Sequence, residues 1–577
     1  MSESGNRDLP GSANHTLRCT GNGNQPRSSR GPWRAAVLLA VHAFIAWRIA
    51  IGLEGEPTLS PLEPSEAAAA LASRVVDAGL IFFALTVLTT LVVGRFFCGW
   101  ACHLVALQDG AAWLLGKLGL RPRPIRSRLL ACAPFVAAAV MFGWPFVESA
   151  LSSGPQPPWR LELTTDDYWG RFPGPVVAGV TFLVCGFAAV WILGAKGFCT
   201  YACPYGALFG MADRFAPGRI RVDRDACETC GHCTAVCTSN VVVHDEVARF
   251  GQVVDPGCMK CLDCVSACPK DALSFGFGAL APTDRSRNRI ERPRARTYDF
   301  SRGEELAMAG VFVLALASLF KSYALVPLLL ATTLAVLVAF ASVLAVRLVR
   351  RGDLRFQGWT LKRSGSWTPA GATALAVCLA AVGLTGHTGA VQTSEVRAFL
   401  ALRQVSEQRS PSRTESLERA HAALLDVERL GLIRREGLYN QLGQVEAELG
   451  LDEAATFNLE QAILEAPDAL APRRKLVEVL DRSDRPEALA EALWGLIERE
   501  PLDRDRAIAL ATSGTLTRLV QAQPEALAPR LIVIAANLAV GDVDTAELNL
   551  DRATERFGAE EPSLLELRAR VSTLRGL

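Results

Sequence analysis

The sequence predicts a mainly α-helical membrane protein that carries an inserted cysteine-rich domain and a C-terminal domain of helical pairs. Half of its 577 residues are hydrophobic, and many of them gather in uncharged runs long enough to cross a bilayer. Between these runs the same cysteine pattern occurs twice, at 227–237 and 258–268, here called the first and second comb. The last third of the chain has no cysteine and follows a helical period of hydrophobic residues.

Apolar runs predict seven membrane spans, of which the fifth is short. The spans lie at 35–52, 76–97, 129–147, 174–195, 306–320, 323–346 and 370–386. Arginine and lysine gather in alternate loops, and such loops stay in the cytoplasm. The N-terminus and the segment from Lys196 to Arg302 are therefore expected inside, and the tail after the seventh span outside. If 306–320 does not cross, the tail is cytoplasmic instead.

The predicted spans divide the chain into five parts. Residues 1–32 are rich in Gly, Asn, Ser and Arg and are expected to be disordered, because they offer almost nothing to bury. The other parts are a four-span membrane domain at 33–200, a cytoplasmic domain at 201–296, three further spans at 297–390 and a helical domain at 391–577.

Each comb reads C-x2-C-x2-C-x3-C, in which three neighbouring thiolates bind one 4Fe–4S cluster and the fourth cysteine reaches across to another. The predicted ligand sets are Cys227, Cys230, Cys233 and Cys268 for cluster one, and Cys258, Cys261, Cys264 and Cys237 for cluster two. The insert is thus expected to be a bacterial-type two-cluster ferredoxin domain of the α+β class. Paired zinc sites and disulfides are the alternatives. Zinc sites usually have a longer gap between two pairs, and a cytoplasmic loop disfavours disulfides.

Three further stretches, together with the combs, carry a family resemblance: GRFFCGWACHLVALQD, GFCTYACPYGALFG and CTSNVVVHDEV. Residues 94–278 resemble the membrane polyferredoxins that serve periplasmic nitrate reductase and nitrous-oxide reductase maturation. The iron–sulfur assembly factor of cbb3-type cytochrome oxidases is a close relative of that group. The resemblance implies a multi-span inner-membrane protein whose cytoplasmic clusters take part in electron transfer, often linked to the quinol pool.

The sequence departs from the pattern of these polyferredoxins in two places. Family members usually carry C-x3-C-P twice, and here Pro204 follows Cys203 whereas His103 follows Cys102. Thr238 also stands where ferredoxins commonly have proline. Thr238 should not prevent cluster assembly, because proline supplies no ligand and only shapes the turn.

Two C-x3-C pairs lie where predicted spans leave the membrane on the inner side: Cys98 with Cys102, and Cys199 with Cys203. Four-residue spacing on a helical turn directs both sulfurs of a pair the same way. The four thiols could bind a soft metal such as copper(I) or act as a dithiol relay. The alternative is that they are small, buried residues that line helix contacts.

His42 lies inside the first predicted span. An ionisable group within a membrane is a functional candidate, and His42 could contact a quinone headgroup. The alternative is a neutral imidazole bonded to a neighbouring helix. A b-type haem is disfavoured, because no second histidine lies in the middle of a span.

The tail after residue 391 is expected to form a tetratricopeptide-like α-solenoid. The following residues occupy repeat positions: Tyr439, Leu442, Gly443, Gly450, Ala455, Leu459, Ala462 and Pro467. A partial second copy has the same mutual spacing at Gly541, Ala546, Leu550 and Ala553. Such solenoids suggest the docking of a protein partner. The alternative is an amphipathic bundle that packs on itself.

These features favour a membrane-bound protein that passes electrons through two clusters, from quinol or a soluble donor to a redox protein partner. The competing hypothesis is an assembly factor that reduces or delivers copper for a respiratory oxidase through the four C-x3-C thiols. A third hypothesis makes the C-terminal repeats the working part and the clusters a redox sensor. The net charge of +1 and the lack of a long basic stripe argue against a nucleic-acid partner.

Overall fold

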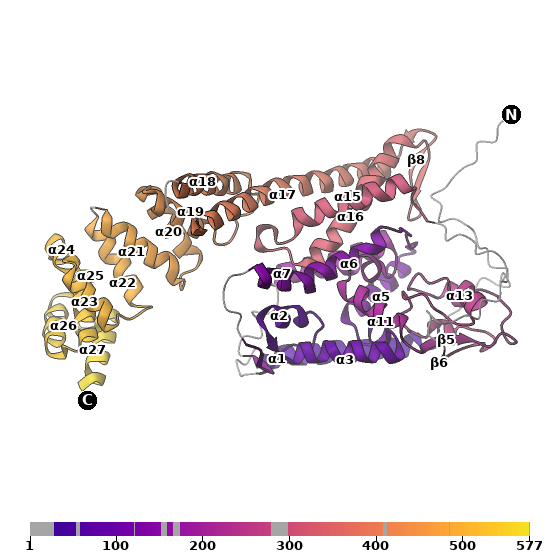
Figure 1. Cartoon of the computed structure of the whole chain (residues 1–577), viewed down its shortest axis with the longest axis horizontal. Helices are drawn as coiled ribbons and strands as arrows, with labels where there is room; N and C mark the ends of the chain where they lie inside the picture. Colours follow the sequence, from indigo (N-terminus) through magenta and orange to yellow (C-terminus); the bar gives the residue numbers. More distant parts are fainter. Residues whose placement is uncertain are drawn as a thin grey trace. The chain divides into compact units, whose positions relative to one another are not determined.

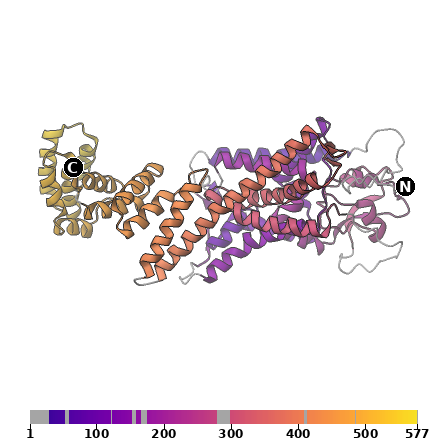
Figure 2. The same cartoon turned by 90° about the horizontal axis from the view of Figure 1, so that it is seen from above.

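The computed structural model divides the chain into two compact units, residues 1–389 and 390–577 (Figures 1 and 2). It describes residues 28–52, 58–120, 122–151, 158–165, 174–278, 298–407, 412–483 and 485–575. Most of the N-terminal segment predicted to be disordered lies outside these ranges. Its last residues, 28–32, are placed: the Ser28 hydroxyl donates a hydrogen bond to Asp263 Oδ1 over 2.7 Å, and helix α1 (Gly31–Gly52) begins within them.

Among the described residues, five helices are long and apolar enough to cross a membrane, and each overlaps a predicted span. They lie at Gly31–Ile51, Leu130–Val147, Pro175–Leu193, Leu328–Arg350 and Pro369–Val405. The second is built from η1 (Leu130–Cys132), α6 (Ala133–Ala138), η2 (Ala139–Gly143) and α7 (Trp144–Leu151). The third is built from α8 (Pro175–Phe182), η4 (Leu183–Ala188) and α9 (Ala189–Leu193). The last two are α16 (Leu328–Arg350) and α17 (Pro369–Glu407). α16 is the most buried of the five and forms the centre of the helical core.

The other two predicted spans are shorter helices. α3 (Ala78–Val93) has 16 residues and ends at Gly94, which has a φ of 78°. α15 (Arg302–Leu319) begins with a capping box at Ser301 and carries charged residues in its first turn, so its apolar part is shorter than a bilayer needs. It packs along α16, which follows the turn η5 (Ser322–Ala324). That α15 crosses the membrane stays a prediction.

The same break occurs twice in the membrane helices. After α3 the chain turns at Gly94 into the short helix α4 (Phe96–Trp100) and then α5 (His103–Lys117). After α9 it turns at Gly194, with a φ of 104°, into α10 (Gly197–Tyr201) and α11 (Pro204–Arg214). Both glycines adopt positive φ, a conformation that costs glycine little. Each C-x3-C pair lies at such a break.

Short elements close the two ends of the membrane helices. One group consists of α2 (Glu66–Ser73), the antiparallel pair β1 (Thr58–Leu59) and β4 (Thr164–Thr165), and the parallel pair β2 (Val75–Val76) and β3 (Arg160–Leu161). α2 packs on the first turn of α3, where Gly79 leaves room for the buried Glu66. A three-stranded sheet joins α16 to α17: β7 (Leu354–Phe356), β8 (Trp359–Arg363) and β9 (Ser366–Trp367).

The inserted domain is a small α+β fold. Its two antiparallel strands are β5 (Gly218–Val222) and β6 (Leu273–Phe277), and its helices are α12 (His232–Ala235), α13 (Val243–Phe250) and α14 (Asp263–Ser266). Ile220, Val247 and Leu273 are buried in its core. β5 lies near the start of the insert and β6 near its end. Both combs therefore lie between the two strands in the sequence, and cysteines of both combs pack against the same core.

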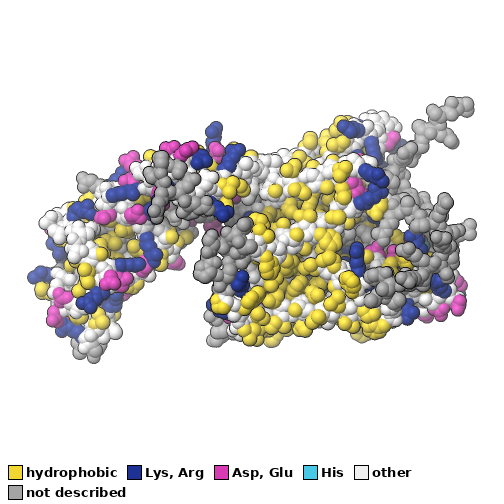
Figure 3. Space-filling model, in the orientation of Figure 1, with side chains coloured by type: hydrophobic (Ala, Val, Ile, Leu, Met, Phe, Trp, Pro, Cys, Tyr) yellow, Lys and Arg dark blue, Asp and Glu magenta, His cyan; other side chains and the backbone are white. Residues whose placement is uncertain are grey.

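Hydrophobic side chains cover the helices of the first unit in a broad band, and Lys and Arg gather beside the inserted domain (Figure 3). Large apolar side chains such as Leu88, Val176 and Leu314 are more than half exposed. A contiguous apolar surface of this kind is what a lipid bilayer covers.

The second unit consists of helices that pack in antiparallel pairs. They are α18 (Ser412–Leu430), α19 (Leu438–Leu449), α20 (Asp452–Glu465), α21 (Leu470–Arg482), α22 (Pro486–Ile497), α23 (Arg504–Thr512), α24 (Thr515–Ala522), α25 (Leu527–Val540), α26 (Val543–Phe557) and α27 (Pro562–Arg575). α17 runs to Glu407, so the domain boundary predicted at 391 falls inside a continuous helix.

Two of these pairs share the contacts expected from the sequence. In α19 and α20 a β-carbon on Gly443 would lie 2.6 Å from Leu459 Cγ, and Ala455 is fully buried. α19 and α25 both end at a left-handed glycine, Gly450 and Gly541. The assignment of these pairs to tetratricopeptide repeats stays a prediction.

Replacing Gly443 with valine should lower the free energy of unfolding by about 1–3 kcal/mol, because the added carbons overlap Leu459 in a packed contact. Thermal unfolding of the full chain in detergent, followed by circular dichroism, measures this. Ala454→Val is the matched control, since Ala454 is exposed on α20. Equal melting temperatures for the two variants would contradict the close contact.

Candidate metal centre

The first predicted ligand set lines one cavity of about 280 Å³ in the inserted domain. Its cysteines are Cys227, Cys230, Cys233 and Cys268. Three come from the first comb around α12, and the fourth comes from the turn after α14. Glu228 and Lys270 also line this cavity; they are paired over 2.9 Å, and both side chains are more than half exposed. This site is therefore close to the surface of the domain.

The second predicted ligand set lines a smaller and deeper cavity. Its cysteines are Cys237, Cys258, Cys261 and Cys264. Ile220, Val243 and Val253 line the same cavity, and all three are buried. In both sites three cysteines of one comb meet the last cysteine of the other comb.

The combs have matching backbone turns. Thr229 and Lys260 lie directly before the second cysteine of the first and second comb, and each has a φ of 51°. Gly231 and Leu262, directly after that cysteine, also have left-handed backbone conformations. Such a conformation costs a non-glycine residue about 1–3 kcal/mol and persists only where its surroundings fix it, most often at functional sites. The shared turns indicate that each comb is shaped to wrap a bound group.

The donor sets fit iron–sulfur clusters better than single metal ions. Thiolates that bind one zinc ion at about 2.3 Å have sulfurs only about 3.8 Å apart. Within the described ranges no three His, Cys, Asp or Glu side chains are placed to hold one metal ion, and all fifteen described cysteines are free. Burial raises the pKa of Cys233 to about 11 and that of Cys237 to about 12, so bound metal would have to displace the thiol protons.

The inserted domain is fixed to the membrane helices around Asp213 on α11. Lys260 Nζ lies 2.9 Å from Asp213 Oδ1, and neither side chain is exposed. The same carboxylate oxygen accepts a hydrogen bond from the backbone N of Arg95 over 3.1 Å. Trp100 Nε1 donates to the carbonyl of Lys260 over 3.0 Å. The second comb is thus attached to both broken helices.

Gly99 makes the closest approach between the two parts. A β-carbon on Gly99 would overlap the carbonyl oxygen of Met259 and lie 3.4 Å from Cys261 Cα. The backbone of the first C-x3-C pair therefore lies directly against the second comb.

The structure brings the two C-x3-C pairs into one group, here called the thiol quartet: Cys98, Cys102, Cys199 and Cys203. The four pack in the same buried cluster. Cys102, Cys199 and Cys203 each lie close enough to other members of the quartet for those neighbours to raise their thiol pKa values. Burial raises the pKa of Cys102 to about 12, and Cys98 and Cys199 act in the same direction.

Two family models match the segments that form these sites. A model described as a 4Fe–4S dicluster domain matches residues 219–269, which hold both combs. A model described as a 4Fe–4S binding domain matches 78–121 and 176–223, which hold the thiol quartet. The matches indicate that the chain binds 4Fe–4S clusters.

The ferredoxin-type protein NapH of Haemophilus influenzae is 30% identical over 241 residues, which cover 39% of this chain and 76% of NapH. The chain belongs to this family of ferredoxin-type membrane proteins. The methylamine utilization ferredoxin-type protein MauN of Methylorubrum extorquens is 31% identical over 202 residues, covering 33% of this chain and 65% of MauN. NapH of Escherichia coli is 28% identical over 203 residues, again covering 33% and 65%. No solved structure matches the chain.

His42 of this NapH-like protein lies on an exposed face of α1, where its Nδ1 is 2.8 Å from the carbonyl of Leu38 in the preceding turn. It lies within electrostatic range of His103, which stands where the second C-x3-C pair has proline. Burial lowers the pKa of His103, and His42 adds to this effect while Glu63 opposes it.

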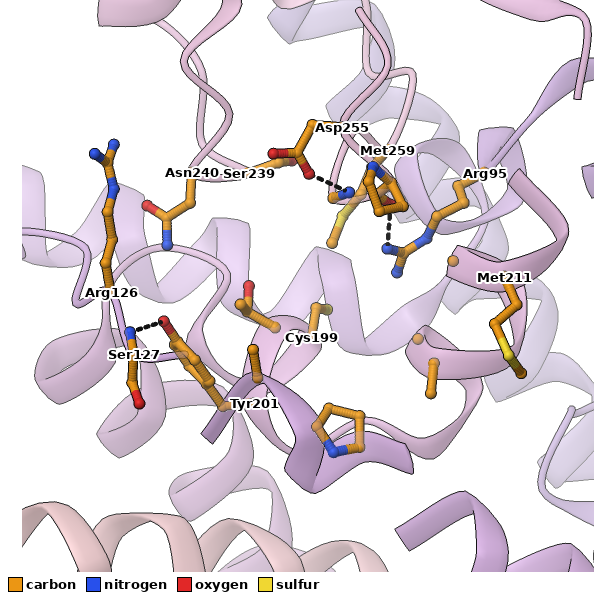
Figure 4. Close-up of a pocket in the computed structure, with 18 of the residues that line it drawn as sticks. Arg95, Arg126, Ser127, Cys199, Tyr201, Met211, Ser239, Asn240, Asp255 and Met259 are labelled. Carbon is orange, nitrogen blue, oxygen red and sulfur yellow. Dashed lines mark hydrogen bonds between the residues drawn. The ribbon is translucent and has the colours of Figure 1, made fainter. Parts of the chain in front are cut away.

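A cavity of about 500 Å³ lies between the inserted domain and the membrane helices (Figure 4). Arg95 and Cys199 line it from the membrane side, and Met259 from the inserted domain. Phe135 on α6 and Met211 on α11 also line it and are 44% and 42% exposed, so the cavity borders the outer apolar surface. His42 is not among the lining residues.

The sequence-based predictions missed the cations beside the thiol quartet. Arg95 and Lys196 are 5% and 1% exposed and follow Gly94 and Gly194 by one and two residues. The sequence did contain a pattern that could have revealed them. In both halves of the membrane domain a basic residue stands between the glycine that ends a span and the C-x3-C pair. Asp213 gave no local signal, because its partner is distant in sequence.

Replacing Asp213 with alanine should cost about 3–5 kcal/mol of stability, because it leaves the Lys260 ammonium buried without its counter-charge. The measurements are the melting temperature in detergent and the iron content per chain. Arg249→Met removes a partly exposed ion pair with Asp245 in the same domain and should leave both values unchanged. Similar behaviour of the two variants would count against Asp213 as an anchor.

Proposed function

We propose that this protein carries single electrons from the membrane to a redox protein through two 4Fe–4S clusters, held by the two cysteine sets predicted from the combs. The observation that carries the proposal is the lining of the two cavities: each holds three cysteines of one comb and the last cysteine of the other. A bound 4Fe–4S cluster exchanges one electron at a time while its cysteine ligands stay in place. The printed names of NapH and MauN, as ferredoxin-type proteins, support the same function.

The burial of the two sets supports a direction for the path. In the second set Cys261 and Cys264 are buried, and Cys261 lies against Gly99 of the first broken helix, whereas all four cysteines of the first set are only partly buried. Electrons would therefore enter at the second set and leave at the first, where Glu228 and Lys270 offer a charged surface to a partner.

We further propose that the electron donor is a quinol whose headgroup binds in the 500 Å³ cavity. The volume is typical of a small-molecule site, and its apolar border at Phe135 and Met211 suits an isoprenoid tail. A quinol that becomes a quinone releases two electrons and two protons. The electrons would pass one at a time past Cys199 to the second comb, and the protons would leave to water through the charged residues that line the cavity.

The proposed topology has the inserted domain in the cytoplasm and the C-terminal domain in the periplasm of an inner-membrane protein. Arg34 pairs with Asp263 of the insert, and Arg126 lines the cavity beside it, as the positive-inside preference requires. The paired helices of the C-terminal domain would dock a protein partner in the manner of tetratricopeptide repeats.

The crossed ligand sets can be tested with single substitutions. Cys268→Ser should abolish the cluster that Cys230→Ser abolishes, although Cys268 belongs to the other comb, because both line the first cavity. Electron paramagnetic resonance of the dithionite-reduced protein distinguishes the two cluster signals. If Cys268→Ser instead matched Cys264→Ser, the ligand sets would not cross.

The quinol site can be tested by narrowing the cavity. Ala131→Trp should block reduction of the clusters by a quinol while dithionite still reduces them, because Ala131 lines the cavity. Cys132→Trp is the control, since Cys132 is exposed next to it and does not line the cavity. Quinol reduction that survives in both variants would remove the cavity from the path.

A further inference from the structure

The thiol quartet has the features of a third redox centre, in a place that neither comb reaches. Cys98 and Cys102 come from the first broken helix, and Cys199 and Cys203 come from the second. The two breaks have the same order of elements, so each half contributes two thiols from equivalent positions. A group held by all four would join the two halves of the membrane domain.

A buried cation without a carboxylate faces this quartet. The Arg95 side chain is nearly fully buried, yet in the described part of the chain it forms no ion pair, and its Nε has no hydrogen-bond partner. One terminal nitrogen donates to the carbonyl of Pro256 over 2.9 Å, and the guanidinium also lies against Cys98. Burial of an uncompensated charge is costly, so an anionic group is expected among the thiols beside Arg95.

Further positive charge and N–H donors surround the same sulfurs. Lys196 is 1% exposed and close enough to Cys199 to act on its thiol. Gln108 Nε2 donates to Cys199 Sγ over 3.0 Å, and the backbone N of Gly206 donates to Cys203 Sγ over 3.3 Å. Such donors stabilise thiolates and the negatively charged clusters that thiolates hold.

We propose that Cys98, Cys102, Cys199 and Cys203 bind a third 4Fe–4S cluster, next to the second comb. A single copper or zinc ion fits less well, because within the described ranges no three metal-binding side chains converge on one ion. The 4Fe–4S binding domain model matches residues 78–121 and 176–223 and includes all four quartet cysteines but no comb cysteine. Gly99 packs against Cys261 Cα, so this cluster would lie beside the second comb.

The test uses the full chain, purified anaerobically in detergent and reconstituted with ferrous iron and sulfide. The native protein should contain about twelve irons and twelve labile sulfides per chain, and three paramagnetic signals after reduction by dithionite. The variant Cys98→Ser with Cys199→Ser should lose about four irons and one signal and retain the two comb signals. Cys185→Ser is the matched control, because Cys185 is equally buried nearby but bonds Thr333 instead.

About eight irons in the native protein would overturn the proposal, and so would eight irons with one copper or zinc that the double variant loses. If the double variant fails to fold, Arg95→Gln decides the assignment. The third signal should then persist with a lowered reduction potential, because a nearby cation favours the more negative reduced state, and Arg95→Lys should restore it. If the reduction potential of the third signal stays the same in both variants, the third cluster does not lie at the quartet, and the proposal is wrong. The comb signals report separately on the two-cluster function proposed above.

Discussion

The buried carboxylate of Asp213 connects the parts of the molecule on which the metal sites depend. Taking a lysine and an aspartate out of water costs several kcal/mol per ion, so the Asp213–Lys260 pair persists only with good geometry and further bonds. Asp213 Oδ1 meets both Lys260 Nζ and the backbone N of Arg95, and its carbonyl accepts from Arg219 at the start of β5. One residue thus positions a broken helix, a strand and the second comb together.

Two duplications explain why so few residues suffice to build the sites. The combs repeat the same left-handed turns, and the membrane helices repeat the same glycine break. One comb supplies only three cysteines to a cavity, and one C-x3-C pair supplies only two thiols to the quartet. Since neither half is sufficient alone, a bound group would favour the assembled form, and binding would be coupled to folding.

The parts of this architecture that follow local patterns could be predicted from the sequence. Comb spacing anticipated which cysteines share a cavity, and hydrophobic runs anticipated five long helices. The end of α3 at Gly94 was missed, because the apolar run continues through Phe96 and Phe97 and only the positive φ ends the helix. The contacts of Arg95 could not be predicted either, because they join segments more than one hundred residues apart, and Lys260, which pairs with Asp213, lies 47 residues away outside the same helix.

Charge balance explains why these distant contacts occur beside the thiols. Arg34 lies 3.0 Å from Asp109, which also accepts a hydrogen bond from Lys196. Lys260 forms an ion pair with Asp213. Asp109 and Asp213 are therefore already paired, and the Arg95 guanidinium bonds a carbonyl and lies against a cysteine sulfur. In a medium of low polarity a buried guanidinium without an ion-pair partner lowers the free energy of an anionic group beside it. The same field would favour the reduced state of a cluster bound in the second comb, and so would draw electrons from the membrane towards the inserted domain.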